Sequence, residues 1–138
     1  FILNHEGIED HMLCQKLSSD LGGGIQIFSH WNPAIIKTVI GRSKIVISSR
    51  FHGCVSALSQ GVPVIATSWN HKYEMLLEEY GLSKNLVSLT TSVLDYDMLE
   101  SVLSLQQKHT VKKHALSHEL DTRAMWTDVF NFIKQNIL

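Results

Sequence analysis

The sequence predicts an α/β fold with a doubly wound parallel sheet, and three observations carry this prediction. Short apolar segments alternate along the chain with longer segments whose apolar residues recur at helical spacing. Glycine or proline stands at many of the junctions between them. Residues 44–48 are uniformly apolar at their centre, as in a strand of a parallel sheet covered on both faces. Together these features indicate βαβ units with right-handed crossovers.

Five short segments are predicted to be strands, and the last has the weakest pattern. They span residues 1–4, 25–28, 44–48, 62–67 and 85–89. Pro63 fits near the start of the fourth strand, because proline within a sheet is confined to edges, bulges and strand starts.

The segments between and after these strands are predicted to be helices. Asn32 and Pro33 begin the second helix as its N-cap and first helical residue. Three consecutive glycines, residues 22–24, end the first helix. The last predicted helix has apolar residues along one face. The predicted helices span residues 7–21, 33–41, 51–60, 71–80, 95–107 and 111–137.

Composition excludes several classes of protein. The 138 residues are 44% hydrophobic and carry a formal net charge of −1, which describes a soluble globular protein. A general nucleic-acid or membrane-surface binder usually has a basic excess. No apolar run approaches the roughly 20 residues of a membrane helix. Cys14 and Cys54 lie in apolar helical patterns without zinc-type spacing, so we expect buried free thiols in a reducing compartment.

Polar residues follow each predicted strand. In doubly wound sheets, ligands bind outside the carboxyl ends of the strands, so these residues are expected on one rim. They lie at positions 4–6, 29–30, 48–50, 67–70 and 88–91.

Arg50 and His52 are the strongest candidates on this rim. They flank Phe51 where the third strand passes into a helix. A helix N-terminus has unpaired N–H groups and a partial positive charge, and arginine adds a fork suited to phosphate or carboxylate. Gly53, which follows, is small and therefore allows a ligand or the neighbouring strand to approach closely. The pattern predicts an anion site; the alternative is a surface arginine beside a capping histidine.

Lys72 is the second candidate, together with Asn70 and His71. It begins the helix after the fourth strand, where its ammonium can reach an anion held by the neighbouring turn. A cation is mildly unfavourable near a helix N-terminus, which favours a functional reason for its position. A solvated lysine is the alternative.

No metal or cofactor is predicted. His5, Glu6, Glu9, Asp10 and His11 are close in sequence, but their spacing matches no standard ligand pattern. Polar residues that open a helix are common caps, which is the simpler interpretation of this segment.

The candidate residues belong to a longer pattern that resembles the polysaccharide pyruvyl transferase family. That family's signature is a strand ending in Ser-x-Arg-Leu-His, a helix, a Gly-x-Pro strand and a lysine before the next helix. This chain has Ser48-Ser-Arg-Phe-His52, then Gly61-Val-Pro63, then Lys72. Phenylalanine at position 51 replaces the usual leucine. The resemblance covers about residues 30 to 90.

The resemblance implies a two-domain enzyme of glycosyltransferase-B type, with residues 1–138 as its C-terminal, donor-binding, Rossmann-like domain. Family members transfer the pyruvyl group of phosphoenolpyruvate onto two hydroxyls of a sugar, forming a ketal and releasing phosphate. The missing N-terminal domain would help to bind the saccharide acceptor. We expect the cytoplasm or the inner face of the membrane as its location.

Within that resemblance, Arg50 and His52 would hold the donor and carry the catalysis. Arg50 cannot exchange its proton, so its role is electrostatic. His52 is either the general acid or a phosphate ligand. Ser49, Lys72 and Asn70 are further candidates for substrate binding. Two other functions stay open: a donor domain for a nucleotide sugar, and a binding domain without catalysis.

Overall fold

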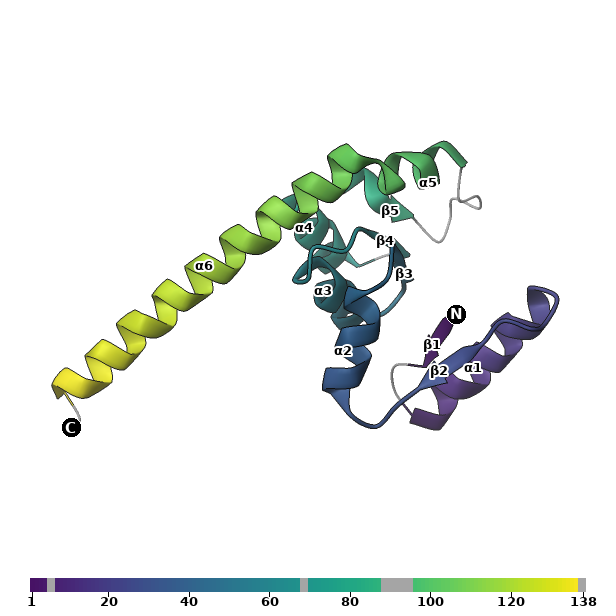
Figure 1. The fold of residues 1–138 in the computed structure, drawn as a ribbon, viewed down its shortest axis with the longest axis horizontal. Helices are drawn as coiled ribbons and strands as arrows, with labels where there is room; N and C mark the ends of the chain where they lie inside the picture. The colour runs from purple at the N-terminus through teal and green to yellow at the C-terminus, as the bar shows by residue number, and fades with distance from the viewer. Residues whose placement is uncertain (5–6, 68–69, 88–95, 137–138) are drawn as a thin grey trace. The chain divides into compact units, whose positions relative to one another are not determined.

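A computed structural model describes residues 1–4, 7–67, 70–87 and 96–136. The chain divides into two compact units, Phe1–Val39 and Ile40–Leu138, called unit 1 and unit 2 below. Figure 1 shows the elements of each unit along the colour gradient from the N-terminus to the C-terminus.

Unit 1 is a βαβ unit followed by the start of a further helix. Strand β1 (Ile2–Asn4) is joined to the parallel strand β2 (Ile27–Ser29) by helix α1 (Gly7–Asp20). The register pairs residue 2 with residue 27 and residue 4 with residue 29, so both strands end at the same level. Helix α2 (Pro33–Gly41) follows, and crosses from this unit into the next.

Unit 2 contains a three-stranded parallel sheet in the order β3-β4-β5. Its elements alternate strand and helix until a helical C-terminal part (Figure 1). They are β3 (Val46–Ser48), α3 (Phe51–Leu58), β4 (Val64–Thr67), α4 (His71–Glu79), a 3₁₀ turn (Ser83–Asn85), β5 (Leu86–Val87), α5 (Tyr96–Leu103) and α6 (Leu105–Asn136).

The core of unit 2 lies where its sheet meets α3, α4 and the C-terminal helices. Fully buried apolar side chains come from each of these elements, including Leu58, Ile65, Leu77, Val102 and Val111. Buried Asn85 links the layers, because its Nδ2 donates to the carbonyl of Val64 at 2.8 Å. This core holds α3 and α4, the helices that carry the candidate residues His52 and Lys72.

The predicted fold class is confirmed. Each of the five predicted strands is present within its predicted span or one residue beyond it, and the printed strand pairs are all parallel. No helix within residues 1–4, 7–67, 70–87 and 96–136 combines the length and apolarity needed to cross a membrane.

The predicted break between the last two helices was wrong. It lies at Ser104, because the Ser104 hydroxyl accepts from the backbone N–H of Gln107 at 3.2 Å and caps α6. Ser104 and Gln107 have the spacing of a capping box, a signal that the apolar periodicity of this stretch concealed.

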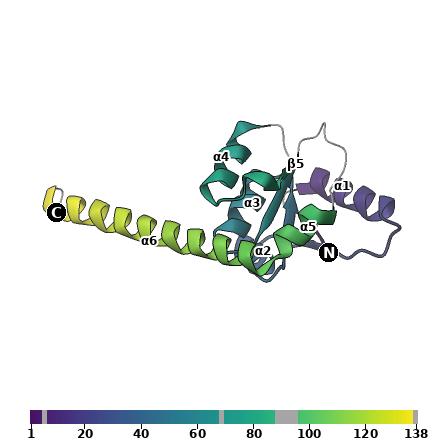
Figure 2. The ribbon, with the colours of Figure 1, turned by 90° about the horizontal axis from the view of Figure 1, so that it is seen from above.

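Helix α6 has an apolar side that is largely exposed beyond its first turns. Val111 is fully buried, whereas Trp126 and Phe130 are about half or more exposed. In Figure 2 the C-terminal half of α6 extends beyond the other elements of its unit. The predicted amphipathic pattern is therefore present, but only its N-terminal part packs on the core.

Candidate functional site

The turn between β3 and α3 is held by its own polar groups. Arg50 is the N-cap residue of α3 and has an extended backbone, with φ −99° and ψ 123°. The Ser48 hydroxyl accepts from the Arg50 N–H at 3.0 Å and lies 3.1 Å from the Arg50 carbonyl oxygen. The turn therefore presents Ser49, Arg50 and His52 as exposed side chains from a fixed backbone.

Gly53 makes this turn possible. A Cβ at position 53 would lie 2.8 Å from the Ser48 hydroxyl oxygen, closer than real Cβ atoms come. The close approach predicted for Gly53 thus serves the turn's own hydrogen bonds.

Tyr73 joins the start of α4 to this turn. Its hydroxyl donates to the carbonyl of Ser49 at 2.7 Å, and its ring meets Phe51 edge to face at 5.5 Å between centroids. Tyr73 is buried, with 6% of its surface exposed. One side chain therefore connects the first turn of α4 directly to the turn that follows β3.

Lys72 reaches the same place. Its ammonium nitrogen lies 4.9 Å from the centroid of the Phe51 ring and 5.6 Å from that of Tyr73. A cation over an aromatic face is attracted by the ring quadrupole, by about 0.5–1 kcal/mol at an exposed site. The structure thus brings Lys72 onto the segment that contains Arg50 and His52, at the carboxyl end of the sheet.

Asn70 is the N-cap of α4. Its Oδ1 accepts from the backbone N–H of Lys72 at 3.0 Å. The neighbouring His71 places its Nδ1 2.7 Å from a carboxylate oxygen of Glu74, on an exposed face. Asn70 therefore fixes the backbone that carries Lys72, and His71 is engaged with its own helix.

The thiol beside the site is inert. Burial raises the pKa of Cys54 to about 11, against a smaller lowering from the hydrogen bond with Ser48. Because the thiolate is the reactive form of cysteine, Cys54 acts as a small apolar residue under the turn.

Some predicted rim residues lie outside the described residues, namely positions 5–6, 68–69 and 88–91. Among the residues that are described, no group of three or more His, Cys, Asp or Glu could hold a metal ion.

The sequence reasoning missed Tyr73. Its contribution depends on contacts 24 and 22 residues away, with Ser49 and Phe51. The available signal was an aromatic residue directly after the lysine of the pattern, and an aromatic residue at position 51 to receive it.

A comparison with models of known protein families identifies the family to which this chain belongs. Residues 1–71 match the family model described as polysaccharide pyruvyl transferase. The chain belongs to that family. The matched segment includes Ser49, Arg50 and His52 and ends one residue before Lys72. The searches of curated proteins and of solved structures gave no match. Membership in a family of transferases indicates an enzyme, and the match over residues 1–71 confirms the family named from the resemblance.

Proposed function

We propose that this chain binds phosphoenolpyruvate and supplies the donor site for transfer of its pyruvyl group to a saccharide. The observation that carries the proposal is the position of the Lys72 ammonium over the ring of Phe51, the residue between Arg50 and His52, at the carboxyl end of one parallel sheet. The Tyr73 hydroxyl and the Phe51 ring hold the start of α4 against the turn that follows β3. Family membership supports the same donor.

The chemistry of phosphoenolpyruvate suits these residues. The donor carries a phosphate and a carboxylate, so its binding needs several cationic or N–H groups. Arg50 offers a planar fork for one oxyanion, and Lys72 offers a compact charge for another. The N–H groups of the first turn of α3 add a partial positive charge at the same place.

Ketal formation assigns distinct roles to the two strongest candidates. A proton delivered to the methylene carbon of the donor makes it a methyl group and leaves a cationic C2. A first sugar hydroxyl adds to C2, phosphate leaves, and a second hydroxyl closes the ketal; the two hydroxyl protons balance the one delivered and the one carried by phosphate. His52 can deliver or hold a proton in this sequence. Arg50 stabilises the charge of the phosphate as it leaves.

We further propose that residues 1–138 form one Rossmann-like domain, the donor half of a two-domain enzyme of glycosyltransferase-B type. The alternation of parallel strands and helices, found in both units, supports this assignment. Under this proposal the chain binds its donor but needs the other half to complete transfer.

Calorimetric titration of the chain with phosphoenolpyruvate and, separately, with UDP-glucose tests the proposed donor. We expect saturable binding of phosphoenolpyruvate that weakens in His52→Ala and is unchanged in His109→Ala, a histidine exposed on α6. Binding of UDP-glucose without phosphoenolpyruvate would instead support a nucleotide-sugar donor. Binding of neither ligand would contradict the proposal that this chain contains the donor site.

A further inference from the structure

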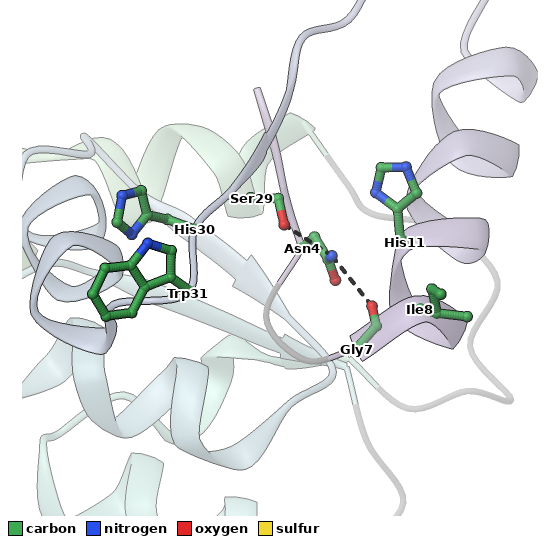
Figure 3. A pocket seen from close by; sticks show the side chains of 7 residues that line it. All are labelled: Asn4, Gly7, Ile8, His11, Ser29, His30 and Trp31. Atoms are coloured by element: carbon green, nitrogen blue, oxygen red, sulfur yellow. Dashed lines mark hydrogen bonds between the residues drawn. The ribbon is translucent and has the colours of Figure 1, made fainter.

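Unit 1 has a pocket of its own at the carboxyl ends of β1 and β2. Its volume is about 410 Å³, within the range of small-molecule sites. Figure 3 shows the side chains that line it. They include Asn4 from β1, His11 from α1, Ser29 from β2, and the following His30 and Trp31. All of these residues belong to unit 1, so the pocket does not depend on unit 2.

The side chain of Asn4, which lines this pocket, is only partly hydrogen-bonded. Its Nδ2 donates to the Ser29 hydroxyl at 3.1 Å and to the carbonyl of Gly7 at 3.3 Å. The side chain is 9% exposed, and its Oδ1 has no hydrogen-bond partner within the described part of the chain. A buried acceptor without a donor is costly. The oxygen itself is closed off from solvent, so a ligand hydroxyl would supply the missing donor once the Asn4 side chain shifts to face the pocket.

The rim of the pocket is an aromatic platform. The Trp31 side chain is 88% exposed and stacks on His30 at 5.7 Å between centroids, with 22° between the ring planes. His30 in turn stacks on Phe28 at 6.5 Å. The stack orients the Trp31 ring before any ligand arrives, so little ordering is required on binding.

His30 also has a defined hydrogen-bonding direction. Its Nδ1 accepts from the backbone N–H of Asn32 at 2.9 Å. The neutral ring therefore carries its proton on Nε2, which can donate to a ligand oxygen. The Ser29 hydroxyl accepts from Asn4, so its own hydrogen can also be donated.

The charge of the lining separates this pocket from the site in unit 2. Among the described residues that line it, none is a lysine, arginine, aspartate or glutamate. An anion such as phosphoenolpyruvate would find no fixed opposite charge here. The lining suits an uncharged ligand with one apolar face and several hydroxyls.

We infer that this pocket binds a pyranose ring of a saccharide, with the apolar face of the ring on Trp31 and a hydroxyl donating to Asn4. This inference rests on the proposed function in one respect: the saccharide would be the acceptor of the pyruvyl group. The pocket then gives this chain a direct part in acceptor binding, in addition to its part in donor binding.

The three tryptophans of the chain allow a test with an internal control. The probes are methyl β-D-glucopyranoside, methyl β-D-galactopyranoside and methyl β-D-mannopyranoside, each titrated into ¹⁵N-labelled chain. We expect at least one glycoside to shift the indole N–H signal of Trp31 saturably, and that of Trp126 to stay in place. Trp31→Ala should weaken binding roughly tenfold or more, and Trp126→Ala should leave it unchanged.

Two outcomes would overturn the inference. One is the absence of a saturable Trp31 shift with all three glycosides; the other is a shift with adenosine alone, which indicates a nucleoside site. Because Trp31 is exposed, its removal should leave the far-ultraviolet circular dichroism unchanged, and this is checked first. Phosphoenolpyruvate is titrated into the same sample. Glycoside binding without phosphoenolpyruvate binding would reject the proposed donor and support this pocket. Phosphoenolpyruvate binding without glycoside binding would support the proposed donor and reject this pocket.

Discussion

Units 1 and 2 both contain parallel strands joined by a helix, but they bury very different amounts of apolar side-chain surface. In unit 2, apolar side chains such as Leu58 and Leu77 are completely buried. In the described part of unit 1, the buried apolar residues are Cys14 and Ile36, and Asn4 and Asp10 are buried as well. Parallel strands joined by a helix therefore do not guarantee a large apolar core.

The two units also differ at the edge where parallel sheets bind ligands. Unit 2 presents Arg50 and His52 at a turn held by Ser48 and Tyr73, and Lys72 in the first turn of α4. Unit 1 presents an aromatic pocket whose described lining residues include no lysine, arginine, aspartate or glutamate. The same position in two βαβ units thus suits an anionic donor in one case and a hydroxyl-rich ligand in the other.

The largest expected effect tests the difference in burial. Leu58→Ala should lower the free energy of unfolding by about 2–5 kcal/mol, because a fully buried side chain leaves a cavity. The matched change in unit 1, Leu13→Ala, removes a side chain that is 61% exposed and should cost no more than about 0.5 kcal/mol. Urea unfolding of both variants measures the two values. Equal losses would contradict the comparison.

The next effect concerns the helix caps, which both units use. Asn70→Ala should cost about 1 kcal/mol, because the Lys72 N–H loses its acceptor. Asn70→Asp should restore most of the loss, since a carboxylate caps equally well. Asn32 accepts from the Ala34 N–H at 2.9 Å, so Asn32→Ala should lower stability by a similar amount through the loss of the α2 cap. An unchanged unfolding midpoint in Asn70→Ala would show that the cap contributes nothing.

A smaller change tests the connection between α4 and the turn that follows β3. Tyr73→Phe keeps the ring on Phe51 but removes the bond to the Ser49 carbonyl, which should cost about 0.5–1.5 kcal/mol of stability. The affinity for phosphoenolpyruvate should fall at the same time, because the turn that carries Arg50 is no longer joined to the helix that carries Lys72. The control is Tyr96→Phe, at an exposed tyrosine on α5. An unaltered affinity in Tyr73→Phe would mean that the connection does not position the site.

The last effect is absent at neutral pH and concerns the contribution of Cys54 to stability in alkali. Burial raises its pKa in the folded protein from the ordinary 9.0 to about 11. Below pH 9.0 the thiol is protonated in both the folded and the unfolded chain, and its full contribution to stability is present. Between pH 9.0 and about 11 the thiol ionises in the unfolded chain but stays protonated in the folded protein, so this contribution is lost as the pH rises. Cys54→Ala should show a shallower loss of stability over this window in unfolding experiments at several pH values. Parallel curves for the two proteins would contradict the assignment.

Much of the fold was readable from the sequence because its signals are local. Asn32 and Pro33 mark a helix start by their own chemistry, and the apolar centre of residues 44–48 marks strand β3. The cover expected on both faces of that strand was wrong, because Ile47 is 52% exposed. Arg50 and His52 could likewise be chosen, since they stand at a strand end before a helix.

Other features could not be read because they depend on contacts distant in sequence. Tyr73 reaches Ser49 across 24 positions, and Asn4 meets Ser29 across 25. The pocket of unit 1 was missed for this reason, although His30 and Trp31 were visible as polar and aromatic residues after a strand. The break at Ser104 was missed because apolar periodicity was weighed above capping chemistry.

The central claim is that unit 2 holds phosphoenolpyruvate through Arg50. Calorimetric titration of the wild-type chain, Arg50→Ala and Arg42→Ala tests it most directly, because Arg42 is an exposed arginine on the amino-terminal side of β3. Loss of a charge-assisted hydrogen bond predicts at least about tenfold weaker binding in Arg50→Ala and no change in Arg42→Ala. Equal affinity in all three proteins would contradict the account.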